Sequence, residues 1–228
     1  DMARADLVRV TGLSPTTVSA LVDELVREGL VLEAGYARTM QTGRKPINLC
    51  INAAGRQIPV FSLGRYGVRY TLYNLKMEPL ETLFLNHSAE QYGGFDVDAP
   101  DPNPDASADY AELIRDILLR RSKLYQPEIA LAVCVSFPGI YLSEKKLFSL
   151  STLHISIRRE VMEELEEELG VTLFFGNSSQ SLAYAEKKRL DGMGQQEENL
   201  IYVNVCDGVG AGIISEGEVF TGKDGFAG

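Results

Sequence analysis

The stretch over residues 3–30 constrains the fold of this chain more than any other. Its apolar residues recur at i, i+3, i+4, i+7 and i+8, the spacing of one buried helical face. These residues are Val18, Leu21, Val22, Leu25 and Val26. A smaller apolar stripe lies upstream, at Ala3, Leu7 and Val10. Gly12 permits the positive φ of a tight turn, Ser14 can cap the second helix and Pro15 suits its first turn. The stretch therefore predicts two short helices joined by a turn.

The opposite face of the second helix carries small and polar side chains. They are Thr16, Thr17, Ser19, Ala20 and Asp23. Side chains of this size can approach a DNA groove closely, so the pattern is typical of a helix-turn-helix reader. We expect the DNA-binding face to consist of Ser14, Thr16, Thr17, Ser19 and Ala20. A helix pair used only for dimer packing is the alternative.

A β-hairpin is expected directly after the helix pair. Residues 30–33 and 47–51 resemble short strands, and residues 35–43 resemble the loop between them. The tip region holds basic side chains, Arg38, Arg44 and Lys45. Such a wing contacts phosphates or the minor groove and positions the reading helix. The alternative is a solvated basic loop; we favour the wing because the hairpin follows the helices directly.

The charge of the chain is unevenly distributed. The net charge is −10, yet residues 1–52 hold six Lys/Arg and six Asp/Glu, so the remaining residues carry all of it. An acidic body repels phosphate, so we expect DNA to contact the neutral N-terminal part with modest, salt-sensitive affinity unless the chain dimerises. The chain has no run of 18 apolar residues and no signal-peptide layout. We therefore expect a cytoplasmic protein.

Beyond residue 56 the pattern changes to alternating strands and helices, which predicts an α/β domain. The expected strands cover residues 58–63, 68–74, 81–86, 129–136, 173–176 and 200–205. The expected helices cover residues 110–124, 158–169 and 181–190, and residues 92–109 read as an acidic surface loop. We place the domain boundary so that residues 1–55 form the first domain and residues 56–228 the second.

Two glycine-rich stretches have the look of phosphate-binding loops. One runs from Asp207 to Gly212 after an expected strand, and the other from Ser62 to Gly67 between two strands. Glycine frees backbone N–H groups to hold a phosphate. Taken alone, such stretches are turns as often as sites.

The order of these motifs resembles the ROK family, in its transcriptional-repressor branch. The matching segments are 13–19, 42–46, Pro138-Gly139, Asn177–Gln180, 208–212 and 225–228. The resemblance covers essentially the whole chain. It implies a winged helix-turn-helix followed by a sugar-kinase-like domain of the actin/hexokinase (ribonuclease H-like) type, comprising the first lobe and the start of the second. On this basis we expect a C-terminal truncation, and a repressor that dimerises and responds to sugars.

Departures from the family pattern argue against catalysis. Where ROK kinases have an Asp-x-Gly-Gly-Thr turn, this chain has Ser62 and Gly64 followed by a bulky Arg-Tyr pair. The family's general base is replaced by Ser178, whose hydroxyl cannot accept the proton at neutral pH. Asp207 stands where kinases have Thr, against a would-be phosphate. We therefore interpret Ser62, Gly64, Asp207, Gly208 and Gly210 as a degenerate nucleotide site and expect no enzyme.

The resemblance also implies a sugar site. Its candidate residues are Gly139, Thr152, Asn177 and Ser178. Asn177 reads equally well as a turn residue that ends a strand. We expect no metal ligands and no cofactor within these residues; the family's zinc cluster would lie beyond Gly228. Ala20 stands where many family members carry Arg, which leaves base reading to weaker contacts.

These observations favour a DNA-binding transcriptional regulator, a repressor of carbohydrate genes. The expected partners are a double-stranded DNA operator, a sugar or sugar-phosphate effector and a second copy of the chain. An ATP-dependent sugar kinase is the alternative, and ATP turnover on glucose, N-acetylglucosamine or xylose would distinguish it. A constitutive DNA binder whose body only dimerises is the third hypothesis.

Overall fold

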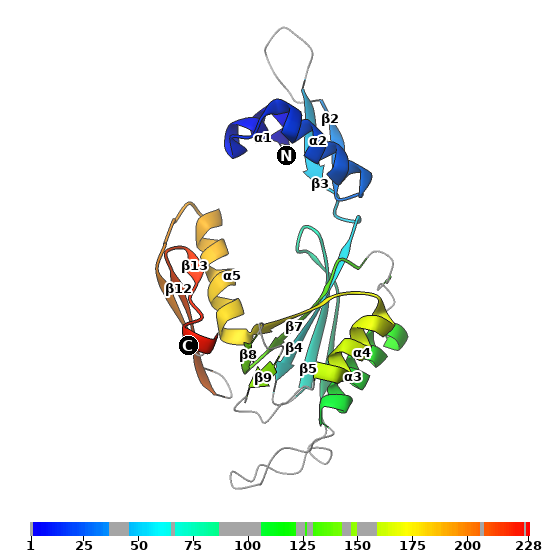
Figure 1. The fold of residues 1–228 in the computed structure, drawn as a ribbon, viewed down its shortest axis with the longest axis vertical. Helices are drawn as coiled ribbons and strands as arrows, with labels where there is room; N and C mark the ends of the chain where they lie inside the picture. Colours follow the sequence, from blue (N-terminus) through cyan, green and yellow to red (C-terminus); the bar gives the residue numbers. More distant parts are fainter. Residues whose placement is uncertain are drawn as a thin grey trace.

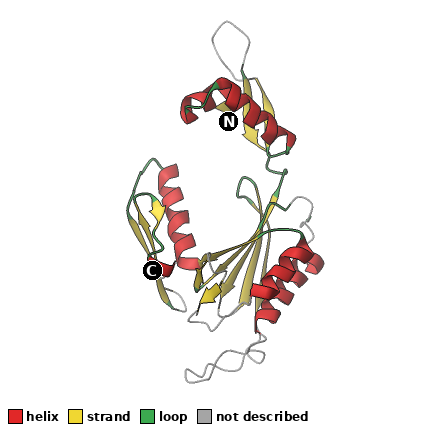
Figure 2. Cartoon of the chain, in the orientation of Figure 1, coloured by secondary structure: helices red, strands yellow, loops and turns green. Residues whose placement is uncertain are grey.

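The computed structural model describes residues 2–36, 46–64, 67–86, 106–121, 126, 130–142, 147–149, 159–205, 208–225 and 227–228. Figure 1 shows three groups of elements: a small N-terminal unit, a central sheet with helices packed on it, and a helix that lies on a second sheet. Figure 2 separates the helices from the strands in the same view. Strands and helices alternate along the central part, so the predicted α/β class is confirmed. Among the described residues, no helix is both long and apolar enough to cross a membrane.

The N-terminal unit consists of two helices and a small antiparallel sheet. Its elements are β1 (Met2–Ala3), α1 (Arg4–Thr11), α2 (Pro15–Arg27), β2 (Val31–Tyr36) and β3 (Ile47–Ile51). The turn forms as predicted, because Gly12 has φ +70° and donates its N–H to the Val8 carbonyl over 2.9 Å. Ser14 Oγ accepts the N–H of Thr17 over 3.1 Å, which caps α2. In the sheet, β3 lies between β1 and β2.

The core of this unit is narrower than the helical pattern predicts. Val18, Val22 and Leu49 are buried, with Leu7, Val8, Val26 and Val31 packed partly around them. Leu21 and Leu25 are 45% and 38% exposed, so their predicted burial is wrong. The short sheet covers the side of α2 that carries Val18 and Val22. The neighbouring side, with Leu21 and Leu25, stays exposed to solvent. Val10, which the predicted stripe included, is exposed as well. Val8 packs against the buried residues in its place.

The junction after β3 is held tightly against the end of α2. Asn52 donates its backbone N–H to the Leu30 carbonyl over 2.9 Å and its side-chain Nδ2 to the Gly29 carbonyl over 2.7 Å. Gly55 lies so close to this point that a Cβ there would stand 2.0 Å from the Gly29 oxygen. Residues 52–56 thus form a close-packed link between β3 and the central sheet. The predicted boundary falls within this link.

The central sheet has five strands in the order β10-β7-β4-β5-β6. They are β4 (Gln57–Gly64), β5 (Gly67–Asn74), β6 (Pro79–Asn86), β7 (Val133–Phe137) and β10 (Leu173–Asn177). β4, β7 and β10 run parallel, whereas β5 pairs antiparallel with β4, and β6 pairs antiparallel with β5 at the edge of the sheet. A two-stranded ribbon, β8 (Ile140–Leu142) and β9 (Leu147–Ser149), follows β7.

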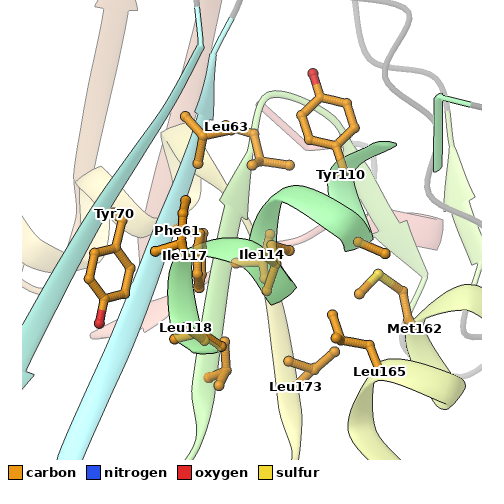
Figure 3. Packing of buried hydrophobic residues seen from close by; sticks show 14 of the residues in the cluster. Phe61, Leu63, Tyr70, Tyr110, Ile114, Ile117, Leu118, Met162, Leu165 and Leu173 are labelled. Atoms are coloured by element: carbon orange, nitrogen blue, oxygen red, sulfur yellow. The ribbon is translucent and has the colours of Figure 1, made fainter. Parts of the chain in front are cut away.

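Two helices bury the apolar side chains of this sheet. They are α3 (Ala106–Asp116), continued by a π-helical turn (Ile117–Arg121), and α4 (Arg159–Leu169). Figure 3 shows Phe61 and Tyr70 of the sheet beside Ile114 and Ile117, with Leu165 on α4. The first helix begins four residues before the predicted start at residue 110. β7 begins at residue 133 because Ala130 forms only an isolated bridge with Gln57.

The third group consists of one helix on a second sheet. It comprises α5 (Ser178–Gly192), β11 (Leu200–Val205), β12 (Val209–Ser215), β13 (Glu218–Val219) and a 3-10 turn (Lys223–Gly225). The strands are antiparallel in the order β11-β12-β13, and α5 packs on β11 and β12. The helix begins three residues before the predicted residue 181.

Candidate functional site

The candidate reading face lies at the start of α2. Thr16, Thr17 and Ala20 are exposed and Ser19 is half-buried. Ser14 and Thr17 place their hydroxyl oxygens 2.8 Å apart in the helix cap, so both side chains hold the start of the helix. The structure thus presents all five predicted residues on one short segment, where Ser14, Thr16, Thr17 and Ala20 are exposed.

Sequence reasoning missed a charged residue that organises this segment. The Arg4 guanidinium contacts Asp23 of α2 at 2.7 Å and Glu33 of β2 at 3.2 Å, and it donates to the Ser19 carbonyl over 3.3 Å. The hydrogen bond with Asp23 is the main cause that raises the pKa of Arg4. The partners lie 19 and 29 residues away, so nothing in local spacing could have identified them.

The hairpin strands form as predicted after α2. β2 and β3 pair antiparallel, with Val31 opposite Ile51 and Glu33 opposite Leu49. The predicted basic tip residues, Arg38, Arg44 and Lys45, lie outside the described residues. Their contact with DNA stays a prediction.

Several predicted body residues meet at one edge of the central sheet. Because β4, β7 and β10 are parallel, their carboxyl ends share this edge, where open α/β sheets commonly bind ligands. Ser62 lies beside Ser136, and Asn177 lies beside Phe137. Asn177 Nδ2 donates to the Gly139 carbonyl over 2.6 Å, so this pair is in direct contact. Gly64 ends β4 next to this edge, and Thr152 lies outside the described residues.

The polar atoms of Asn177 are largely used within the fold. Its Oδ1 accepts the N–H groups of Ser179 and Gln180 over 2.9 and 3.0 Å, which caps α5. The interpretation of Asn177 as a strand-ending turn residue is therefore supported. Ser178 is the first residue of α5 and is half-buried. Its place at the position of the family's general base stays a prediction.

The second glycine-rich stretch is explained by packing. A Cβ at Gly210 would stand 2.6 Å from Ser179 Oγ, and one at Gly212 would stand 2.3 Å from the Ser179 carbonyl oxygen. Both glycines lie in β12, beneath the first turns of α5, so they permit a close approach of helix and sheet. Gly208 precedes this strand, and Asp207 lies outside the described residues. A nucleotide site at these positions stays untested.

The last glycine motif packs against the same elements. Gln180 Nε2 donates to the Ala227 carbonyl over 3.3 Å, and a Cβ at Gly228 would stand 2.0 Å from the Ala211 oxygen. Three motifs that are far apart in the sequence therefore converge around the start of α5.

Metal binding has no support from the part of the chain that the structure describes. No group of three or more His, Cys, Asp or Glu there could hold a metal ion. The zinc expectation concerns residues beyond Gly228 and stays a prediction.

The parallel core strands, the helix capped by Asn177 and the second sheet together define an α/β fold of the sugar-kinase-like type. The chain belongs to the ROK family, whose model matches residues 100–228, more than half of its length. The xylose repressor of Bacillus subtilis is 28% identical over 230 residues, covering 100% of this chain and 55% of that protein. The chain thus spans about half the length of the curated relatives that it matches.

Solved structures show the same fold. A ROK family transcriptional regulator, a homologue of the E. coli MLC protein, superposes with a TM-score of 0.73 at 22% identity, over 98% of this chain and 53% of that one. A ROK family glucokinase from Streptomyces griseus gives a TM-score of 0.55 at 15% identity, over 74% and 47% of the two chains. The regulator match includes the N-terminal unit, whereas the glucokinase match leaves about a quarter of this chain uncovered.

Proposed function

We propose that this chain carries the DNA-reading domain and part of the effector-binding body of a sugar-responsive, cytoplasmic transcriptional repressor. The observation that carries the proposal is the N-terminal unit: α1, the Gly12 turn and α2 with exposed Thr16 and Ala20, followed by paired β2 and β3. This is the layout of a winged helix-turn-helix, in which the second helix reads the major groove. The similarity to a xylose repressor over the full chain supports it.

The body serves as a sensor in this proposal. Ser178 replaces the general base, and Asn177 is engaged in capping α5 and bonding Gly139, so the machinery for phosphoryl transfer is incomplete. A sugar bound beside Gly139, Asn177 and Ser178 would contact both β7 and α5. Binding there would change how the two lobes close, and in a homodimer it would reset the spacing of the two reading helices.

Duplex selection tests DNA binding directly. The chain is incubated with a pool of random 30-base-pair duplexes, and the enriched sequences are measured by fluorescence anisotropy at fixed salt. We expect a selected duplex to bind at least about 10³-fold more tightly than an unselected one. Thr16→Glu should abolish the preference, because it adds a charge to an exposed reading position, whereas Thr82→Glu, at an exposed position of β6, is the matched control. Failure to enrich any sequence would overturn the proposal.

Effector binding is tested by titrating xylose, N-acetylglucosamine and glucose into the chain by calorimetry, with and without the selected duplex. We expect one sugar to bind and to change the duplex affinity. DNA binding without any response to sugar would favour a constitutive DNA binder whose body only dimerises.

A sugar kinase is the second candidate, because the body shares its fold with a ROK glucokinase. Coupled ATP turnover on the same three sugars separates the two hypotheses. We expect no turnover above background, and clear turnover would reject the purely regulatory function.

A further inference from the structure

One arginine joins the three elements that form the proposed DNA interface. Arg4 opens α1, yet its guanidinium reaches Asp23 on α2 at 2.7 Å and Glu33 on β2 at 3.2 Å. It also donates to the Ser19 carbonyl on α2 over 3.3 Å. We propose that Arg4 is a positioning residue for DNA recognition: it fixes the reading helix against the wing strand and neutralises two carboxylates beside the bound phosphates. The inference rests on the proposed function.

The position of Asp23 makes this neutralisation important. Asp23 follows Thr16 by seven residues and Ala20 by three, so the three residues share one side of α2. A carboxylate on that side approaches the DNA backbone together with the reading residues. Without a partner, this carboxylate repels phosphate. The N-terminal unit has no excess positive charge to offset that repulsion, since its six basic residues only balance six acidic ones.

Stability alone does not account for the arrangement. The side chains of Asp23 and Glu33 are 68% and 44% exposed, and ion pairs in such surroundings contribute little to the free energy of unfolding. The planar guanidinium can, however, hold two carboxylates and a carbonyl in fixed directions, which a lysine cannot do. The contacts are therefore better suited to setting the orientation of α2 and the local charge than to holding the fold.

The test uses the full chain and a duplex selected by the unsubstituted protein. We expect Arg4→Met to weaken binding at least tenfold with little change in the thermal midpoint. Restoring neutrality with Asp23→Asn and Glu33→Gln in the Arg4→Met background should recover the part of the affinity that is lost through unneutralised charge, and the part that depends on the orientation of α2 should stay lost; a purely structural role would give no such partial rescue. Arg9→Met is the matched control, because among the described residues the ion pair of Arg9 is with Asp6 of the same helix; this variant should bind much more tightly than Arg4→Met.

Further variants and outcomes test the role of Arg4. Arg4→Lys should bind severalfold more weakly than the unsubstituted chain, and it carries the test if Arg4→Met does not fold. Unchanged binding by the Arg4 variants would overturn this inference while leaving the proposed function intact. A loss that the two neutralising substitutions do not reduce at all would also overturn it, because Arg4 would then contact DNA itself or serve only the fold. If the unsubstituted chain selects no duplex, the proposed function fails, and this inference fails with it.

Discussion

Asn177 links three parts of the molecule through one amide group. Its Oδ1 caps α5, and its Nδ2 bonds the Gly139 carbonyl just beyond β7. A serine in its place can keep the cap without reaching Gly139, whereas an alanine loses both interactions. The residue therefore allows the cap to be separated from the bond to Gly139.

We expect Asn177→Ala to lower the free energy of unfolding by about 1–3 kcal/mol, from the lost cap and the lost hydrogen bond. Asn177→Ser should lower it less, because its hydroxyl can still cap α5 and only the bond to Gly139 is lost. Urea unfolding followed by circular dichroism measures both variants. Equal losses would show that the cap adds nothing.

Cys134 allows a prediction about pH. Burial raises the pKa of its thiol, because the charged thiolate is poorly solvated in β7. Less thiolate is therefore present near pH 8 than for an ordinary thiol, and alkylation should be slow. We expect the labelling rate with iodoacetamide, measured by peptide mass spectrometry, to keep rising above pH 9. A rate that levels off below pH 9 would contradict the raised pKa.

At the scale of elements, the contact between α5 and β12 depends on missing side chains. Ser179 and Ala183 of α5 are buried directly over Gly210 and Gly212. The two glycines meet different atoms, since Gly210 faces the Ser179 hydroxyl and Gly212 faces the backbone. A second substitution at Ser179 can relieve the contact at Gly210, whereas no substitution there removes the backbone oxygen that Gly212 faces.

Both Gly210→Ala and Gly212→Ala should destabilise the chain by about 1–3 kcal/mol through overpacking. Adding Ser179→Ala should recover much of the loss for Gly210→Ala, because the crowding hydroxyl is removed. It should recover little for Gly212→Ala, which still meets the Ser179 carbonyl. Thermal unfolding of the four variants tests this, and equal rescue would refute the packing argument.

Local signals explain which elements were predictable. The limits of α2 follow from Ser14, Pro15 and an apolar period, all of which act within the helix itself. The exposure of Leu21 and Leu25 was not predictable, because it depends on which side of α2 the sheet covers. At the site, the sequence placed Gly139 and Asn177 together through resemblance, but it missed Arg4, whose partners lie on other elements.

At the scale of the whole molecule, one face of the second sheet is apolar and exposed. Ile201, Val203 and Val205 alternate along β11, and Val209 begins β12; each is more than 60% exposed. Soluble monomers rarely leave a contiguous apolar surface of this kind open. The opposite face of the sheet is covered by α5.

We expect the 228-residue chain to bind the dye ANS and to self-associate at micromolar concentration. Val203→Glu should reduce both, because it places a charge in the middle of the face. Leu80→Glu, at a leucine of β6 that is 44% exposed, is the matched control and should have little effect. Sedimentation velocity and dye fluorescence provide the measurements, and a monomeric, dye-free parent chain would contradict this expectation.

The close-packed link at residues 52–56 has a consequence for the geometry of regulation. Asn52 is hydrogen-bonded to Gly29 just after α2, and Gly55 packs directly against Gly29. The N-terminal unit is therefore not joined to the body by a flexible linker. In the proposed dimer, such a link would fix each N-terminal unit to its body. The distance between the two bodies would then set the number of base pairs between the two half-sites. In the proposed repressor, a sugar that changes how the two bodies sit in the dimer would then change the spacing of the half-sites that fit, with no change in the bases that are read.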